Sequence, residues 1–154
     1  MAFAVRRAVR ADADELARLE RLARDAITDV RGGAALLAEQ PAVGDRSAWE
    51  VAIDDASRAV WVALVDEVPV GMLELVLPER AGGAGRVRQV FVRVEARELG
   101  FGDELLAEAV ETTRQAGGAV IESFALPGDR DTKNLYERAG VTARKLIVSK
   151  RLDV

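Results

Sequence analysis

The segment Val90–Leu106 reads Val-Phe-Val-Arg-Val-Glu-Ala-Arg-Glu-Leu-Gly-Phe-Gly-Asp-Glu-Leu-Leu. It begins with a short apolar run of β-branched and aromatic residues, which is typical of a strand. From Leu105 onward, apolar residues recur at helical spacing, which indicates a helix. Gly100 and Gly102 lie between the two. A glycine turn at a helix N-terminus leaves N–H groups unpaired at the positive end of the helix dipole, so the segment predicts a bound phosphate.

A second interpretation of these glycines stays open. Glycine is the usual residue wherever the backbone takes a positive φ, so Gly100 and Gly102 could serve only to turn the chain from strand to helix. Short glycine patterns also occur in many proteins that bind no phosphate. The rest of the sequence has to decide between a structural turn and an anion site.

The composition is that of a globular protein, and the 154 residues are expected to form one domain, 1–154. The net charge of −4 argues against a general nucleic-acid-binding surface. No apolar run approaches the roughly 20 residues that span a bilayer, and the N-terminus lacks the apolar segment of a signal peptide. We therefore expect a cytoplasmic protein that binds neither nucleic acid nor membrane.

Two missing residue types restrict the chemistry. The chain has no cysteine, which excludes a disulfide, a thiol nucleophile and a thiolate metal site. It has no histidine, which excludes a Ser-His-Asp triad, an imidazole base and a histidine-ligated zinc site. No clustered acidic motif suggests magnesium, so we expect no metal. Proton transfer must therefore use carboxylates, the single tyrosine Tyr136, lysine or water.

The apolar patterns predict a mixed sheet with helices. Strands are expected at residues 3–7, 59–65, 70–77, 86–94, 119–126 and 142–148, and helices at 16–27, 34–39, 49–55, 102–117 and 131–138. The short connection at Asp66–Glu67 predicts an antiparallel hairpin. Strands alternate with helices only late in the chain, which favours a mixed, mostly antiparallel sheet.

The order of motifs resembles the GNAT acetyltransferase superfamily, whose members transfer an acetyl group from acetyl-CoA to an amine. The cofactor motif of that family is Arg/Gln-x-x-Gly-x-Gly/Ala, preceded by a strand valine. Here Val92 precedes Arg97 by five residues, and Gly100 and Gly102 occupy the glycine positions. The segment Tyr136–Gly140 is similar to the second family motif, a helix that ends in Tyr-Glu-Lys-x-Gly.

The resemblance implies an α/β (α+β) fold. Its central sheet would be mixed and mostly antiparallel, with about six to seven strands and about four flanking helices. It also implies that coenzyme A binds between two strands that part, with its pyrophosphate at the glycine turn. The residues that would hold acetyl-CoA are Val90, Phe91, Val92, Arg97, Glu98, Leu99, Gly100, Phe101, Gly102, Asp103, Asp129 and Lys133.

By the same resemblance, Tyr136 would protonate the departing thiolate. A phenol suits this role because it is a proton donor at neutral pH and ionises reluctantly in a partly apolar site. The alternative is that Tyr136 is an aromatic side chain packed against the sheet.

The sequence departs from the family pattern at several positions. Glu98 and Leu99 stand where glycine and a basic residue are usual, and Asp103 replaces serine, threonine or a basic residue. Carboxylates beside a pyrophosphate oppose its binding unless they point into solvent. Asp129 stands where an asparagine usually bonds the pantetheine arm, and it accepts hydrogen bonds but cannot donate like an amide. Lys133 could reach the phosphates, or it could be a solvated surface lysine.

The general base is the least defined residue. Glu122 in the predicted strand 119–126 is the first candidate, and Glu74 in the middle of an apolar strand is the second. Burial would raise the pKa of such a carboxylate and make it a competent base. Either residue could instead be an ordinary surface carboxylate, and water could take the proton. If Arg86 and Arg88 line the acceptor side, they favour an amine that carries an anionic group; otherwise they are a solvated pair.

The function expected from this resemblance is an N-acetyltransferase that acts by direct transfer on a small-molecule or peptide amine, whose identity the sequence does not specify. The alternative is a GNAT-fold binding or regulatory module with weak or absent catalysis, which the acidic substitutions and the missing base favour. Family habit also implies a homodimer, formed through the last strands.

Overall fold

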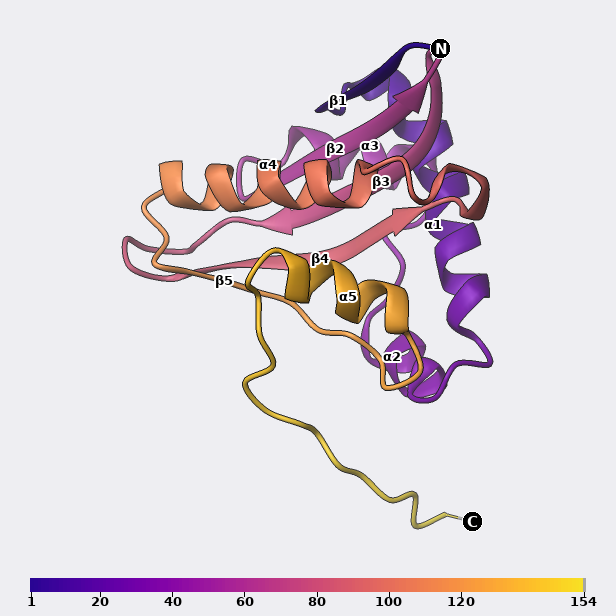
Figure 1. Ribbon diagram of the computed structural model, residues 1–154, viewed down its shortest axis with the longest axis vertical. Coiled ribbons are helices and arrows are strands. Elements are labelled where there is room, and N and C mark those ends of the chain that lie inside the picture. Colours follow the sequence, from indigo (N-terminus) through magenta and orange to yellow (C-terminus); the bar gives the residue numbers. More distant parts are fainter. Residues whose placement is uncertain (154) are drawn as a thin grey trace.

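The computed structural model describes residues 1–153, and its centre is a five-stranded sheet in the order β1-β2-β3-β4-β5 (Figure 1). The strands are β1 (Phe3–Arg7), β2 (Arg58–Val65), β3 (Val68–Val76), β4 (Ala84–Val92) and β5 (Val120–Glu122). Neighbours from β1 to β4 are antiparallel, and β5 pairs with β4 in parallel. The sheet is therefore mixed and mostly antiparallel, as predicted.

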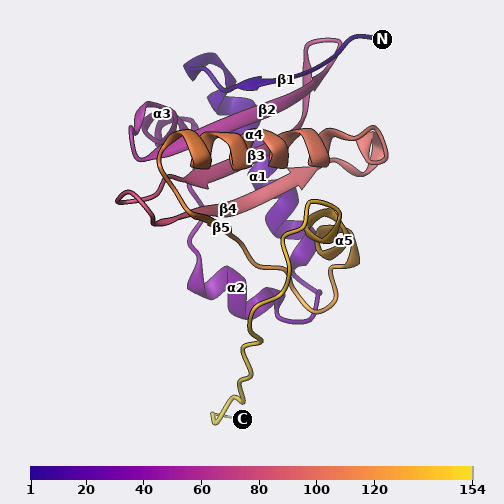
Figure 2. The same cartoon turned by 60° about the vertical axis from the view of Figure 1, so that its left-hand side comes forward.

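Helices cover both faces of this sheet (Figures 1 and 2). The α-helices are α1 (Ala13–Ile27), α2 (Gly33–Glu39), α3 (Arg46–Asp54), α4 (Phe101–Gln115) and α5 (Arg130–Arg138), and the short 3-10 turns are η1 (Arg10–Asp12) and η2 (Val94–Ala96). No helix within residues 1–153 is both long enough and apolar enough to cross a bilayer.

Alternation along the strands divides the core between the two faces. Trp61 points toward the α4 face and packs with Leu105 and Leu106, whereas its neighbour Val62 packs with α1 and α3 residues such as Trp49. All five side chains are at most 2% exposed. The sheet is thus buried on both sides, which fixes the position of β4 between α4 and α1.

The predicted α/β class with a mostly antiparallel mixed sheet is confirmed, with differences in the number of elements. Residues 1–153 form five strands instead of six to seven, and five α-helices instead of about four. The additional helix depends on where α1 and α2 are divided. Gly32 there has a φ of 84°, which ends the turn after α1 and starts α2.

The predicted last strand, 142–148, is wrong. Residues 142–150 adopt no regular structure, and Figure 1 shows this tail leading away from the sheet. Leu146, Ile147 and Val148 are 86–90% exposed. The β-branched run has the propensity of a strand, but a strand also needs a partner with free hydrogen-bonding groups, and the tail does not pair with any described residue.

The predicted strand 119–126 is shortened to β5, residues 120–122, and this shortening opens the sheet. The pairing of β4 with β5 extends only from Ala84–Val120 to Arg86–Glu122. One further link follows, in which the Ser123 hydroxyl donates to the Val87 carbonyl at 3.0 Å. Beyond Ser123 the two strands separate, so the last part of β4 has a neighbour on its β3 side only.

Candidate active site

A cleft of about 1300 Å³ begins where β4 and β5 separate. At one end, here called the α4 end, it is lined by η2, the turn before α4, and α5. At the other, here called the α1 end, it is lined by the second half of α1, by α2 and by Arg88 and Gln89 of β4. Ser123 and Tyr136 line the cleft where β4 and β5 part.

The exposed edge of β4 presents backbone groups to the cleft. The Arg93 N–H donates to the Val70 carbonyl at 2.8 Å, so residues 91 and 93 bond to β3. Because hydrogen bonding alternates along an antiparallel strand, the N–H and C=O groups of Val90 and Val92 point the opposite way, toward the gap left by β5. The Val92 carbonyl accepts a hydrogen bond from Arg97 Nε at 3.0 Å. The Val90 pair is available to a ligand that lies along the strand as a further strand would.

The turn before α4 carries a row of unpaired donors. Within residues 1–153, the backbone N–H groups of residues 98–103 have no hydrogen-bond acceptor, and the first bond at this end runs from the Glu104 N–H to the Gly100 carbonyl. They lie at the N-terminus of a 15-residue helix, whose dipole adds partial positive charge. Such a row binds a phosphate or pyrophosphate, so of the two interpretations of the glycine turn, the geometry supports the anion site.

Both glycines of the turn have a structural requirement. Gly100 has a φ of 85°, and a Cβ there would meet nothing within 4 Å, so the backbone conformation and not space selects glycine. A Cβ at Gly102 would lie 3.3 Å from Leu135 of α5, so this glycine lets α4 and α5 approach each other. Glu98 holds a φ of 71°, which is uncommon for a residue with a side chain. Phe101 points into the core, 2% exposed, while Leu99 is 41% exposed.

Charged side chains around the turn are paired across to α5. Arg138 Nε lies 3.1 Å from Asp103 Oδ1, and Arg97 Nη1 lies 3.2 Å from Asp131 Oδ2. Asp103 therefore does not face the turn as an isolated negative charge, and Arg138 brings a cation to the lining of the cleft. The two pairs also fix α5 against the turn, although exposed ion pairs of this kind contribute little to stability.

Asp129 and Lys133 have local structural roles. Asp129 precedes α5 and caps it, since its carboxylate accepts from the Thr132 N–H at 3.1 Å and from the Thr132 hydroxyl at 2.6 Å. It also lines the cleft. Lys133 does not line the cleft, and its ammonium donates to the Pro127 carbonyl at 2.9 Å.

Tyr136 and Ser123 form a hydroxyl pair at the point where the strands part. Their oxygens are 2.6 Å apart. Because the single Ser123 proton is donated to the Val87 carbonyl, the Tyr136 hydroxyl is the donor in this pair. Burial is the main cause that raises the pKa of Tyr136 to about 12, with a smaller contribution from Asp129, while the Ser123 hydrogen bond lowers it. The phenol therefore keeps its proton at neutral pH.

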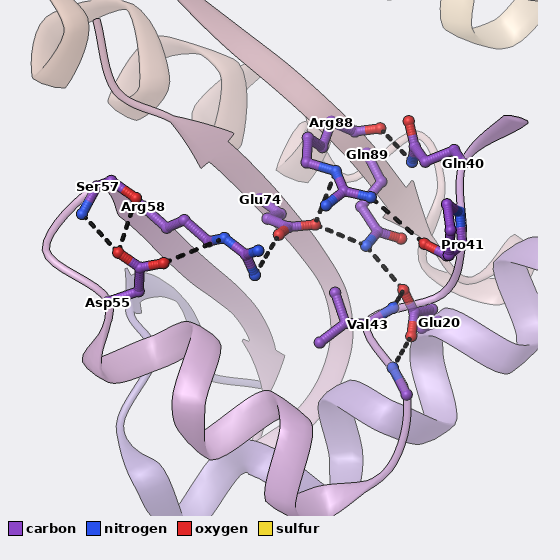
Figure 3. Close-up of polar contacts among 11 residues, drawn as sticks. Glu20, Gln40, Pro41, Val43, Asp55, Ser57, Arg58, Glu74, Arg88 and Gln89 are labelled. Carbon is purple, nitrogen blue, oxygen red and sulfur yellow. Dashed lines mark hydrogen bonds and ion pairs between the residues drawn. The ribbon is translucent and has the colours of Figure 1, made fainter. Parts of the chain in front are cut away.

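Glu74 lies in a buried polar network on the opposite side of β4 from Tyr136 (Figure 3). Its side chain is completely buried, 3.4 Å from Arg58 Nη1 and 3.9 Å from Arg88 Nε. Gln89 Nε2 donates both to Glu74 at 2.9 Å and to Glu20 of α1 at 3.0 Å. Glu74 does not line the cleft.

Glu122 lies outside the large cleft as well. It lines a smaller neighbouring pocket of about 200 Å³, together with Arg86, and its carboxylate is 2.8 Å from Arg144 Nη2 at the start of the tail. The carboxylates that line the large cleft are Glu95, Glu98, Asp103, Asp129 and Asp131, and all of them are at the α4 end. The structure thus brings neither candidate base into the cleft with Tyr136.

Sequence reasoning missed three residues of this site. Ser123 was hidden within a predicted strand, and only the early end of β5 places it beside Tyr136. Arg138 occupies a basic position of the second motif, which was a usable signal. Arg24 on α1 lines the cleft because α1 crosses the end of β4, and no local pattern indicates such a crossing.

The Acetyltransferase (GNAT) family model matches residues 19–141, which is most of the chain. The chain belongs to the GNAT acetyltransferase family. This confirms the resemblance that the glycine turn and the tyrosine motif predicted. The expected reaction class, N-acetyl transfer with acetyl-CoA as the acetyl donor, follows for this GNAT protein, with its acceptor undefined. No curated protein matches the chain in sequence.

Solved structures with the same fold agree with the family assignment. The aminoglycoside N-acetyltransferase AAC(6')-Iy, solved with a bisubstrate analogue that contains coenzyme A, has a TM-score of 0.72 and 14% identity, and 100% of each chain is covered. A ribosomal-protein-alanine N-acetyltransferase from Brucella melitensis has a TM-score of 0.72 and 21% identity, over 99% of this chain and 100% of that one. The BH1408 protein of Bacillus halodurans has a TM-score of 0.81 and 18% identity, over 97% and 99%.

Proposed function

We propose that this GNAT protein transfers the acetyl group of acetyl-CoA directly to a primary amine, with the pyrophosphate of the cofactor at the α4 end and the amine at the α1 end. The observation that carries the proposal is that one cleft joins the unpaired N–H groups of residues 98–103 to the hydroxyl of Tyr136. The residues present fit a polyanionic ligand at the turn, and the free edge of β4 at Val90 fits the amides of its pantetheine arm.

Acetyl-CoA supplies the thioester, whose carbon–sulfur bond breaks as the new carbon–nitrogen bond forms. The amine nitrogen loses one proton to solvent, and the leaving thiolate takes one proton from the Tyr136 hydroxyl. Tyr136 suits this role because it holds its proton at neutral pH in a largely buried position. We assign Ser123 a positioning role, since its hydroxyl fixes the direction of the phenol at 2.6 Å.

The base is water in this proposal. Glu74 is sealed in its network with Arg58 and Arg88, and Glu122 lies in the neighbouring pocket beside Arg144. Of the two predicted candidates, Glu122 has the better access, because its side chain is 37% exposed while that of Glu74 is not exposed at all. Transfer then depends mainly on holding a neutral amine and the thioester close together.

The test is release of free thiol from acetyl-CoA on addition of an amine panel, combined with calorimetry of coenzyme A binding. We expect binding, and amine-dependent thiol release that falls by about 10²-fold in Tyr136→Phe with binding unchanged. Binding without thiol release for any amine would contradict catalysis and support the binding-module alternative. Absence of binding at millimolar coenzyme A would contradict the whole proposal.

We further propose that residues 1–154 act as one catalytic domain, in the cytoplasm, as a homodimer, on small-molecule or peptide amines and not on nucleic acid or membranes. The absence of cysteine and the net charge of −4 support this setting. The exposed apolar tail around Leu146–Val148 supports the dimer, because the free edge of β5 in a second copy offers the backbone partners that these residues lack.

A further inference from the structure

The α1 end of the cleft combines arginines with apolar side chains. Arg24 and Arg88 line it together with the apolar Ala23, Ile27, Leu36 and Phe124. No carboxylate of the described residues lines this end, since the acidic lining residues all belong to η2, the turn before α4, or α5. The adjoining pocket adds Arg86, which is exposed and makes no hydrogen bond or ion pair with any described residue.

The positive charge of these arginines is only partly neutralised. Arg24 donates to two backbone carbonyls, of Gln40 at 2.8 Å and Leu37 at 3.2 Å, and lies within 4.0 Å of no described carboxylate. Arg88 donates to the Pro41 carbonyl at 3.4 Å and stays 3.9 Å from Glu74, which is closer to Arg58 (Figure 3).

The nearby acidic groups are already engaged. Glu20 is 3% exposed, and its oxygens accept from the Val43 N–H, the Gly44 N–H and Gln89 Nε2. Glu122, in the adjoining pocket, is bound to Arg144. Donors of an arginine that are not satisfied by carboxylates favour an anionic ligand.

A bulge in β4 orients Gln89. The register passes from Glu74–Gln89 to Leu75–Val87, so Arg88 is the extra residue, and both Arg88 and Gln89 contact Glu74. The Gln89 amide nitrogen is held between two carboxylates, which accept but cannot donate. The amide is therefore fixed, and its Oε1 has no donor among the described residues, so it can accept from a ligand N–H.

We propose that the acceptor is an apolar α-amino acid or a close analogue, whose carboxylate binds at Arg24, Arg86 and Arg88 and whose amine donates to Gln89. This proposal rests on the proposed function and specifies its acceptor. Ile27, Leu36 and Phe124 supply the apolar surface for the side chain of the acceptor. A polycationic acceptor such as an aminoglycoside would meet repulsion at this end of the cleft.

The same arginines account for a site without a carboxylate base. A positive environment disfavours an ammonium group and lowers its pKa, so the bound amine reaches its neutral, nucleophilic form more readily. Water can then remove the proton before or during attack. The arginines would thus bind the acceptor and also prepare its amine.

The test uses matched acceptors that differ only in the carboxylate: phenylalanine with phenylalaninamide, and leucine with leucinamide, beside spermidine, kanamycin and phosphoethanolamine. We expect kcat/KM to be at least about 10-fold higher for each amino acid than for its amide. Arg86→Gln and Arg88→Gln should lower kcat/KM about 10-fold or more for the amino acids and little for the amides. Arg24→Lys keeps the charge and should retain the preference. The control is Arg114→Gln, an exposed arginine of α4 outside the cleft.

Calorimetry of the amino acids on the protein loaded with coenzyme A separates this inference from catalysis. Turnover of spermidine, kanamycin or the amides at rates equal to or above the amino acids would overturn the inference and leave the acetyltransferase function intact. Preference for phosphoethanolamine alone would overturn the carboxylate assignment. Binding of amino acids that Arg88→Gln abolishes, without any turnover, would keep the inference and overturn catalysis. Neither binding nor turnover would overturn the inference.

Discussion

The Tyr136 hydroxyl oxygen lies 2.6 Å from the Ser123 hydroxyl oxygen, at the last point where β5 still contacts β4. Ser123 in turn donates to the Val87 carbonyl at 3.0 Å. The pair therefore connects the proposed acid to the place where the sheet opens. It relates a feature of the fold, the short pairing of β5, to the chemistry of the cleft.

The first prediction concerns the ionisation of Tyr136, which is the only tyrosine of the chain. Burial raises its pKa from 10.0 to about 12. A titration of phenolate absorbance should therefore show a midpoint near 12 for the folded protein and near 10 after unfolding. A midpoint near 10 in the folded protein would show that the phenol is exposed to solvent and contradict the geometry.

The sign of the effect on stability follows from the same shift. Below pH about 10 the phenol is protonated in both states, so its ionisation does not affect the free energy of unfolding. From pH 10 to 12 the unfolded state ionises and the folded state does not, so stability falls, by about 3 kcal/mol in total. Denaturant unfolding across this range should show that part of the loss in the wild type and not in Tyr136→Phe.

The second prediction concerns Ser123→Ala, which removes the partner of Tyr136 without touching the cleft surface at either end. The phenol loses its fixed direction, so kcat should fall about 10-fold while the affinity for coenzyme A stays the same. The Ser123 hydrogen bond lowers the pKa of Tyr136, so the phenolate midpoint should move up in the variant. Ser123→Thr keeps a hydroxyl and should recover part of kcat. An unchanged kcat in Ser123→Ala would exclude the positioning role.

The third prediction separates charge from backbone strain at Glu98. Its φ of 71° costs about 1 kcal/mol for a residue with a Cβ. Glu98→Gly removes both the strain and the charge, whereas Glu98→Gln removes only the charge. Both variants should bind coenzyme A a few-fold more tightly at low salt, and only the glycine variant should resist denaturant better. Weaker binding in Glu98→Gln would show that this carboxylate does not face the pyrophosphate.

The fourth prediction is a double-mutant cycle on the Asp103–Arg138 pair, whose Nε–Oδ1 distance is 3.1 Å. Arg138→Gln leaves Asp103 unpaired beside the turn and should weaken coenzyme A binding several-fold. Adding Asp103→Asn should restore most of the affinity, and neither change should alter stability by more than about 1 kcal/mol. Purely additive effects in the cycle would mean that the two side chains do not act on the cofactor together.

The fifth prediction concerns the tail. Truncation after Val141 removes the exposed apolar residues 146–148, and sedimentation velocity should then show a monomer where the full chain is a dimer. Ile147→Lys should have the same effect, because a charge there opposes burial against a second copy. A full-length chain that stays monomeric at high concentration would exclude the tail as a dimer contact.

Local patterns predicted those parts of the fold that local physics decides. Periodicity located the helices, and the Asp66–Glu67 turn located the hairpin, because both depend on neighbouring residues. The tail and the second half of the 119–126 strand were wrong, because whether a β-branched run pairs depends on what lies beside it. No short stretch of sequence contains that information.

The candidate site shows the same division. The glycine turn and Tyr136 could be predicted from two short motifs with fixed spacing. Ser123, Gln89 and Arg24 could not, because β5, β4 and α1 bring them to one cleft from distant parts of the chain. Glu74 was predicted as a buried carboxylate and is buried, but the partners Arg58 and Gln89 that occupy it become visible only in three dimensions.

The most direct test of the central claim is a crystal structure of the protein with coenzyme A. The pyrophosphate oxygens should lie within hydrogen-bond distance of the backbone N–H groups of residues 98–103, and the sulfur should lie beside the Tyr136 hydroxyl where β4 and β5 part. A pyrophosphate bound away from the turn before α4, or a sulfur on the far side of β4 from Tyr136, would contradict the account.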